Sequence, residues 1–159
     1  MKIVTTMIHR ISIIIAVFLL GFQLQAQTSY PSFDSSALVW PQAARNIGTK
    51  PYTVVVYGGV GCGYSQFLIQ KLTVLNECAA LCDVVLIMDQ PKDSVLKHMP
   101  NAAALYPTYT NTLLQYQLRK KKDIFPQLLV FKDRELVDHY IGIKEGMLSK
   151  TKERILSGR

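Results

Sequence analysis

The residues best suited to chemistry are Cys62 and Ser65, the ends of the segment Cys-Gly-Tyr-Ser. The segment follows the apolar run Tyr52–Tyr57 and precedes a helical pattern, so the sequence predicts a thiol at a helix N-terminus. The exposed N–H groups and the positive dipole end of a helix favour the thiolate, which is the nucleophilic form of cysteine. We therefore expect Cys62 to react with disulfides.

Ser65 occupies the place of the second cysteine in the common C-x-x-C spacing. A hydroxyl can hydrogen-bond to a thiolate but cannot displace a sulfur from a disulfide, so exchange at Cys62 would stop halfway or be finished by another thiol. Two roles for Ser65 remain open. It could tune the Cys62 thiolate, or its hydroxyl could bond to its own backbone in the first helical turn.

The first 26 residues have the pattern of a secretory signal peptide. Lys2 and Arg10 precede an apolar run over 11–22, and a cut is expected after Ala26. The run of 12 residues is shorter than the about 20 that a membrane-spanning helix needs, so we expect no stable membrane span after cleavage. The predicted location is periplasmic or secreted.

Removal of 26 residues from 159 leaves 133, enough for one domain. We expect residues 27–50 to form an N-terminal lead-in with a helix over 35–46, and residues 51–159 to form the main domain. Loss of two basic residues lowers the net charge from +7 to +5. The dense basic run 119–122 is interpreted as a solvated helix end, and nucleic acid is not an expected partner.

The chain has three cysteines, and we expect Cys62 to be the unpaired one. Cys78 and Cys82 are paired tentatively as a structural disulfide, with a pair of inert buried thiols as the open alternative. If residues 64–80 form one helix, Cys62 and Cys78 are about 24 Å apart, too far for a bridge. Cys78, Cys82 and His98 lack a fourth ligand and a fixed spacing, so no metal site is predicted, and no cofactor is indicated.

Two apolar runs joined by a helix, Tyr52–Tyr57 and Val84–Met88, predict neighbouring parallel strands covered on both faces. Later strands joined by Asp133 and Arg134 predict an antiparallel hairpin. The expected fold class is α/β, with a mixed central sheet that is parallel in its N-terminal half, ends in an antiparallel hairpin and is flanked by helices. The other expected elements are helices over 94–98, 113–121 and 144–156 and strands over 127–132 and 135–141.

Two separated motifs give the chain a resemblance to the thioredoxin superfamily. One is a strand followed by Cys62, Gly63, Tyr64 and Ser65 at the start of a helix, and the other runs from Phe125-Pro126 to Asp133 and on to Gly142. The resemblance implies a thioredoxin-like three-layer fold. It also implies a cis peptide bond before Pro126, which would lie beside Cys62. The residues implied to bind substrate, as an extended peptide, are Gly63, Tyr64, Phe125 and Pro126.

The chain departs from that family at two positions. Gly61 stands where dithiol reductases usually have an aromatic residue, and Val56 stands where they have a buried acid. The missing acid and the missing second thiol are mutually consistent. Cys-Gly-Tyr-Ser is also similar to the motif of monothiol glutaredoxins, but no lysine shortly precedes Cys62 and no Gly-Gly follows the third strand.

Two functions from different classes follow. The preferred hypothesis is monothiol disulfide exchange or isomerisation, in which Cys62 and Ser65 are the catalytic residues and the partners are protein thiols or disulfides. The alternative is a non-catalytic module that docks an extended peptide beside Pro126, with the thiol a relic.

Overall fold

The computed structural model describes residues 47–110, 112–121 and 124–158. The chain divides into two units, Met1–Tyr30 and Pro31–Arg159, and every described residue belongs to the second. The predicted signal peptide, its cut after Ala26 and the helix expected over 35–46 lie outside the described residues. They remain predictions.

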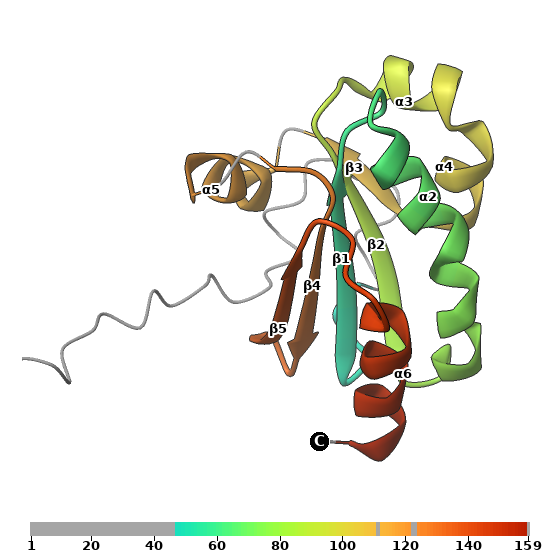
Figure 1. The fold of residues 1–159 in the computed structure, drawn as a ribbon, viewed down its shortest axis with the longest axis vertical. Helices are drawn as coiled ribbons and strands as arrows, with labels where there is room; N and C mark the ends of the chain where they lie inside the picture. The colour runs from blue at the N-terminus through green and yellow to red at the C-terminus, as the bar shows by residue number, and fades with distance from the viewer. Residues whose placement is uncertain (1–46, 111, 122–123, 159) are drawn as a thin grey trace, which may run out of the picture. The chain divides into compact units, whose positions relative to one another are not determined.

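A five-stranded mixed sheet with the order β3-β2-β1-β4-β5 forms the centre of the domain (Figure 1). β1 pairs in parallel with β2, and β2 in parallel with β3, whereas β1–β4 and β4–β5 are antiparallel. The predicted parallel half and C-terminal hairpin are both confirmed. The strands are β1 (Tyr52–Gly58), β2 (Cys82–Met88), β3 (Thr108–Thr110), β4 (Gln127–Lys132) and β5 (Glu135–Ile141).

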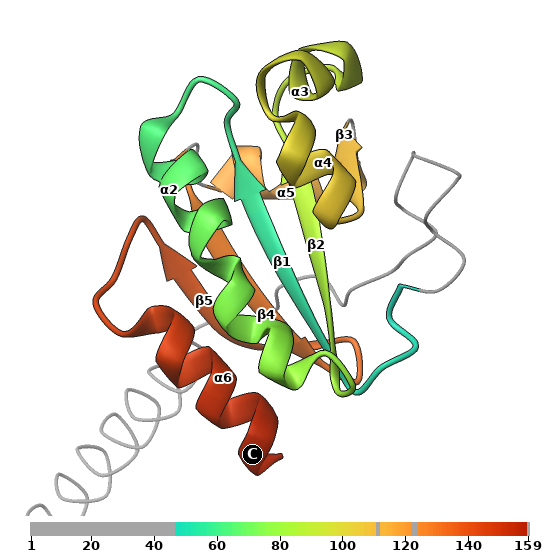
Figure 2. The same ribbon diagram turned by 90° about the vertical axis from the view of Figure 1, so that its right-hand side faces the viewer.

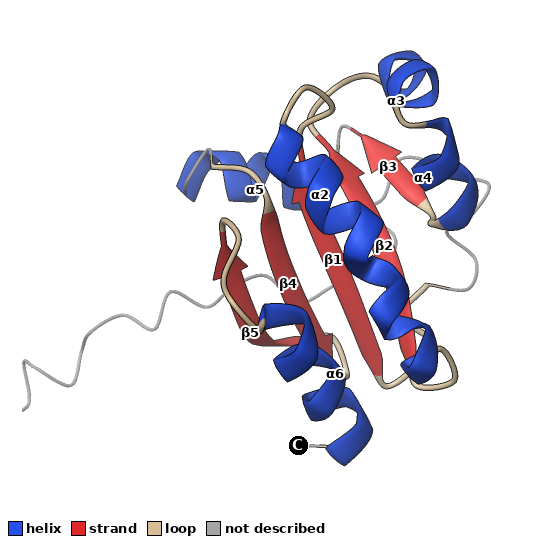
Figure 3. Ribbon diagram, turned by 45° about the vertical axis from the view of Figure 1, so that its right-hand side comes forward, coloured by secondary structure: helices blue, strands red, loops and turns tan. Residues whose placement is uncertain are grey.

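Helices cover both faces of this sheet (Figures 2 and 3). α2, α3, α4 and α6 lie on one face together with the 3₁₀ helix η3, and α5 lies on the other. The three-layer α/β fold class is therefore confirmed. The bounds are α2 (Gly63–Lys71), η3 (Leu72–Cys78), α3 (Lys92–His98), α4 (Pro100–Leu105), α5 (Leu113–Lys121) and α6 (Met147–Ser157).

Alternation along β1 explains why the central strand is apolar throughout. Val54 and Val56 belong to the core cluster beneath α2 and α6, whereas Val55 and Tyr57 belong to the cluster beneath α5. Successive side chains of a strand point to opposite faces, so a strand covered on both sides has no solvent-facing position. β1 thus anchors the segment that follows it, which carries Cys62.

The structure corrects several predicted boundaries. The helix expected over 64–80 is an α-helix that changes to 3₁₀ geometry at Leu72.

The elements α4 and β3 were not expected, because prolines make the sequence between β2 and α5 look irregular. Pro100 instead fills the first turn of α4, where its missing N–H has no helical partner, and the carbonyl of Pro107 accepts from Leu86 N–H at 2.9 Å as β3 begins. α6 begins later than expected because Gly146, in the left-handed region (φ 67°), precedes it.

The tentative disulfide between Cys78 and Cys82 is wrong in this structure, because both are buried free thiols. Cys78 ends η3 and Cys82 opens β2, where its thiol donates to the carbonyl of Asp83 at 3.2 Å. Burial raises the pKa of Cys82 from its ordinary 9.0 to about 12 and also raises the pKa of Cys78. The alternative of two inert buried thiols is the one that the structure contains.

We predict two titratable thiols in a Cys62→Ser variant unfolded without reductant, one each from Cys78 and Cys82. Titration with a chromogenic thiol reagent in denaturant gives the count. The same titration after reduction is the control. A value of zero before reduction and two after it would show that these cysteines are bridged.

Burial of Cys82 also predicts lower stability in alkali. Its folded pKa of about 12 lies above the ordinary 9.0, so its contribution to stability is complete below pH 9 and declines as pH rises toward 12. The free energy of unfolding should fall by up to about 1.4 kcal/mol per pH unit in that window. Because burial also raises the pKa of Tyr109 to about 12, the test compares denaturation of wild type with Cys82→Ala. Equal pH slopes would contradict the prediction.

Candidate functional site

Cys62 is the N-cap residue of α2, as predicted for a thiol at a helix N-terminus. Its backbone is extended (φ −91°, ψ 110°), and its carbonyl accepts the first helical bond, from Gln66 N–H at 3.1 Å. The residue is partly exposed, and the next two residues, Gly63 and Tyr64, are exposed, Tyr64 by 69%. The α2 N-terminus therefore presents a thiol that a partner can reach.

Hydrogen bonds from several elements hold the turn over 58–62 that carries this thiol. The N–H of Cys62 bonds to the carbonyl of Gly59 at 3.1 Å. Val60 donates its N–H to Gln90 Oε1 at 2.6 Å and accepts at its carbonyl from Gln66 Nε2 at 2.9 Å. Two side-chain amides, one from α2 and one from the segment after β2, thus satisfy the backbone of one turn residue.

Ser65 is buried with no exposed surface, and it also holds the turn. Its Oγ accepts from the N–H of Gly59 at 3.2 Å. A Cβ on Gly58 would lie 3.0 Å from Ser65 Oγ and 3.1 Å from Ser65 Cβ, so glycine is needed at 58 for close packing. The hydroxyl therefore bonds to backbone of the preceding turn, and not to its own helix as one alternative had it.

Phe125 and Pro126 lie against the same turn. The peptide bond between them is cis, as the resemblance implied. The Phe125 ring packs edge-on against Tyr57, with ring centroids 4.9 Å apart, and a Cβ on Gly59 would lie 3.3 Å from that ring. Pro126 itself is buried, and its carbonyl accepts from Gly142 N–H at 2.7 Å. Packing thus brings the predicted residues Cys62, Gly63, Tyr64, Phe125 and Pro126 to one end of the sheet.

Gln127 fixes the loop before β4, a role that the sequence did not indicate. The buried side chain donates from Nε2 to the carbonyl of Ile124 at 3.1 Å, and its Oε1 lies 2.8 Å from His139 Nε2. Because the amide oxygen can only accept, His139 Nε2 carries the proton of this bond. His139 is therefore a strand residue that supports the Phe125–Pro126 loop.

Asp89 is a second residue that sequence reasoning missed. Its Oδ1 is buried and would lie 3.3 Å from a Cβ on Gly59, beside the turn that holds Cys62. Asp89 and Gln90 directly follow β2, and the carboxyl ends of neighbouring parallel strands meet at one edge of a sheet. The position of Asp89 directly after an apolar strand was the feature of the sequence that could have identified it as a site residue. By contrast, Cys82 pairs in register with Tyr52 at the start of β1, so Cys78 and Cys82 lie at the opposite end from Cys62.

Solved structures with a similar arrangement of strands and helices show which fold this chain adopts. The chain matches a thioredoxin-like protein in the oxidised form at 14% identity, with 69% of this chain and 80% of that one covered and a TM-score of 0.56. The chain has the thioredoxin fold. The thioredoxin domain of a thiol-disulfide oxidoreductase from Bacteroides vulgatus matches at 9% identity, with 70% and 84% covered and a TM-score of 0.56. A secreted disulfide oxidoreductase of Mycobacterium tuberculosis matches at 9%, with 67% and 81% covered and a TM-score of 0.52.

No protein-family model matches the sequence, and no curated protein matches it significantly. At these identities the likeness establishes the thioredoxin fold alone.

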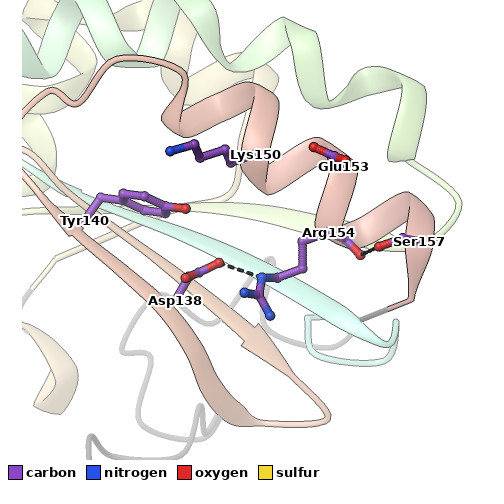
Figure 4. A pocket seen from close by; sticks show the side chains of 6 residues that line it. All are labelled: Asp138, Tyr140, Lys150, Glu153, Arg154 and Ser157. Carbon is purple, nitrogen blue, oxygen red and sulfur yellow. Dashed lines mark hydrogen bonds and ion pairs between the residues drawn. The ribbon is translucent and has the colours of Figure 1, made fainter.

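A hollow of about 410 Å³ lies between β5 and α6 (Figure 4). Its walls carry charges of both signs, and Arg154 Nε is paired with Asp138 Oδ2 at 2.6 Å. Asp138 lies opposite Val130, which pairs with Val54, so the hollow is level with the middle of β1 and away from the Cys62 turn. The paired charges indicate a structural role.

The described residues contain no group of three or more histidine, cysteine or acidic side chains placed to hold a metal ion. They also contain no helix with the length and apolar character needed to cross a bilayer.

We predict that Gly58→Ala destabilises the domain by about 1–3 kcal/mol, because the new methyl group displaces Ser65 from the turn. Gly61→Ala is the matched control, since a Cβ there meets nothing within 4 Å. The double variant Gly58→Ala/Ser65→Gly removes the atoms that clash and should recover part of the loss. Chemical denaturation of the three variants measures these differences. Equal stability of Gly58→Ala and Gly61→Ala would contradict the assigned packing.

Proposed function

We propose that this chain is an exported thioredoxin-fold protein that exchanges or isomerises protein disulfides through the single thiol of Cys62. One observation carries the proposal. A partly exposed thiol caps α2 beside the Phe125–Pro126 loop, while Ser65 fills the place of a resolving cysteine. Neighbours described as thiol-disulfide oxidoreductases lend support at the level of the fold.

The proposed chemistry balances without an added oxidant or reductant. The Cys62 thiolate attacks one sulfur of a substrate disulfide, so that a mixed disulfide forms, the substrate S–S bond breaks and the other substrate sulfur leaves as a thiolate. A different cysteine of the substrate then attacks the substrate sulfur of the mixed disulfide. A new substrate disulfide forms, and Cys62 is released as the thiolate. The net result is isomerisation.

The positions of the other sulfurs support a monothiol mechanism. Cys78 and Cys82 lie at the far end of the sheet, and burial raises the pKa of both. Neither can reach a mixed disulfide on Cys62 without unfolding. Resolution therefore depends on a thiol of the substrate or of another molecule.

The loop before β4 supports binding of an extended substrate segment. Phe125, Gly63 and Tyr64 are proposed to contact the backbone on either side of the substrate cysteine, and the buried Pro126 is proposed to shape the loop that presents Phe125. The same surface would serve the alternative function of docking without chemistry, and only a test of the thiol separates the two. The signal-peptide pattern of residues 1–26 supports export to a compartment where disulfides persist.

We predict that a tagged chain, alkylated rapidly in cells, carries disulfide-linked partners that disappear on reduction. Cys62→Ala should abolish these adducts, whereas Cys78→Ala, which alters a buried thiol, should retain them. Ser65→Cys should also deplete them, because a second thiol at the C-x-x-C spacing can displace the partner. Non-reducing electrophoresis and mass spectrometry of the Cys62 peptide provide the readout.

The two functions predict different outcomes. Partners that co-purify equally with wild type and Cys62→Ala, with no linked species in either, would support the docking module and overturn disulfide exchange. Adducts that persist in Cys62→Ala would show that another cysteine is responsible.

A further inference from the structure

An apolar groove extends from the Cys62 helix toward α6 and has no part in the chemistry described above. It encloses about 300 Å³ between α2 and the segment that joins β5 to α6. Figures 2 and 3 show that α2 and α6 lie on the same face of the sheet. Phe67 and Val74 form one wall, Ile143 and Lys144 form the other, and Leu68 and Met147 lie between them.

The groove exposes large apolar side chains of α2, the helix that Cys62 caps, and of the segment before α6. Phe67 is 50% exposed and Ile143 is 37% exposed, although both side chains are large and apolar. Tyr64, one helical turn before Phe67 and 69% exposed, extends the apolar surface toward Cys62. An exposed apolar surface next to a functional group is characteristic of a binding site.

The groove is also physically joined to the Phe125–Pro126 loop. Gly142 donates its N–H to the carbonyl of Pro126 at 2.7 Å, and Ile143 and Lys144 follow directly. One wall therefore continues from the loop beside Cys62, and the other belongs to the helix that Cys62 caps. The groove and the Cys62 turn therefore share two supporting segments of the fold.

Charge defines what the groove can accept. Lys71 and Lys144 line it, and no acidic residue occurs between Gly59 and Asn76, the stretch that contains α2. Lys71 lies 5.7 Å from the centre of the Phe67 ring, so its ammonium group is held at the groove edge. The complementary ligand carries an apolar side chain followed by a carboxylate.

We propose that the groove docks the substrate segment beside the attacked cysteine, and that it selects an extended sequence with an apolar residue and then an acidic one. This inference rests on the proposed function of Cys62. Phe67 is five helical residues from Cys62, about 7.5 Å along the axis, and Lys71 is nine, about 13.5 Å. An extended chain advances about 3.3 Å per residue, which places the apolar residue two or three positions, and the acid about four, from the substrate cysteine.

The test uses synthetic peptides whose single cysteine is activated as a 2-thiopyridyl disulfide. One peptide carries leucine two positions and glutamate four positions from the cysteine and is prepared in both chain directions. Matched peptides carry serine for leucine, lysine for glutamate, or both replacements. Release of thiopyridone gives the rate of mixed-disulfide formation. Each rate is divided by that of the same protein with 4,4′-dithiodipyridine, a small neutral disulfide.

The leucine–glutamate peptide, in one direction, should react about tenfold faster than the serine–lysine peptide with wild type. Phe67→Ala should remove the preference for leucine, and Lys71→Glu should reverse the preference for glutamate. Leu156→Ala and Lys97→Glu change an exposed leucine and a lysine away from the groove, and they should keep both preferences.

Three outcomes would overturn the inference. Equal normalised rates for all peptides would remove the groove from substrate selection while leaving reactive Cys62 intact. Failure of wild type to react with dithiodipyridine and with every peptide would remove the proposed function itself. A dimer of Cys62→Ala in sedimentation that dissociates on adding Phe67→Ala would show that a second copy of the chain occupies the groove.

Discussion

The turn between β1 and α2 is the constraint on which the site depends. Its backbone groups at Gly59 and Val60 are bonded to side chains of Ser65, Gln66 and Gln90, which come from α2 and from the end of β2. A buried backbone group without a partner would cost about 1–3 kcal/mol, so these bonds fix where α2 begins. These bonds hold Cys62 at the N-terminus of the helix.

Ser65 links the architecture of the site to its chemistry. In the C-x-x-C spacing its position belongs to the thiol that releases a trapped partner. Here the oxygen instead accepts a hydrogen bond from Gly59, and the missing Cβ of Gly58 makes room for it. Serine in place of the second cysteine therefore holds the turn and leaves the protein without a thiol of its own at that position to release a bound partner. The proposed monothiol mechanism rests on this exchange of roles.

The loop before β4 joins three parts of the molecule at one end of the sheet. Phe125 packs on the Gly59 turn, Pro126 bonds to Gly142, and Gln127 is bonded to His139 on β5. The thiol, the Phe125–Pro126 loop and one wall of the α2–α6 groove are therefore joined by direct contacts. In the proposed function, these contacts would hold the groove and the attacking thiol in a fixed register.

The sequence alone determined the four long strands and most of the α-helices, because alternation and helical spacing reflect local geometry. It also gave the two motifs that meet at the site and the placement of Cys62. It failed for α4 and β3, whose prolines made the region look irregular, and for the Cys78–Cys82 bridge, because Cys78 ends η3 whereas Cys82 opens β2. Only the tertiary structure decided that Ser65 bonds to Gly59 and that Asp89 lies beside the same turn. Such contacts join the turn after β1 to α2 and to the segment after β2, and no spacing along the chain encodes which of their atoms come within reach.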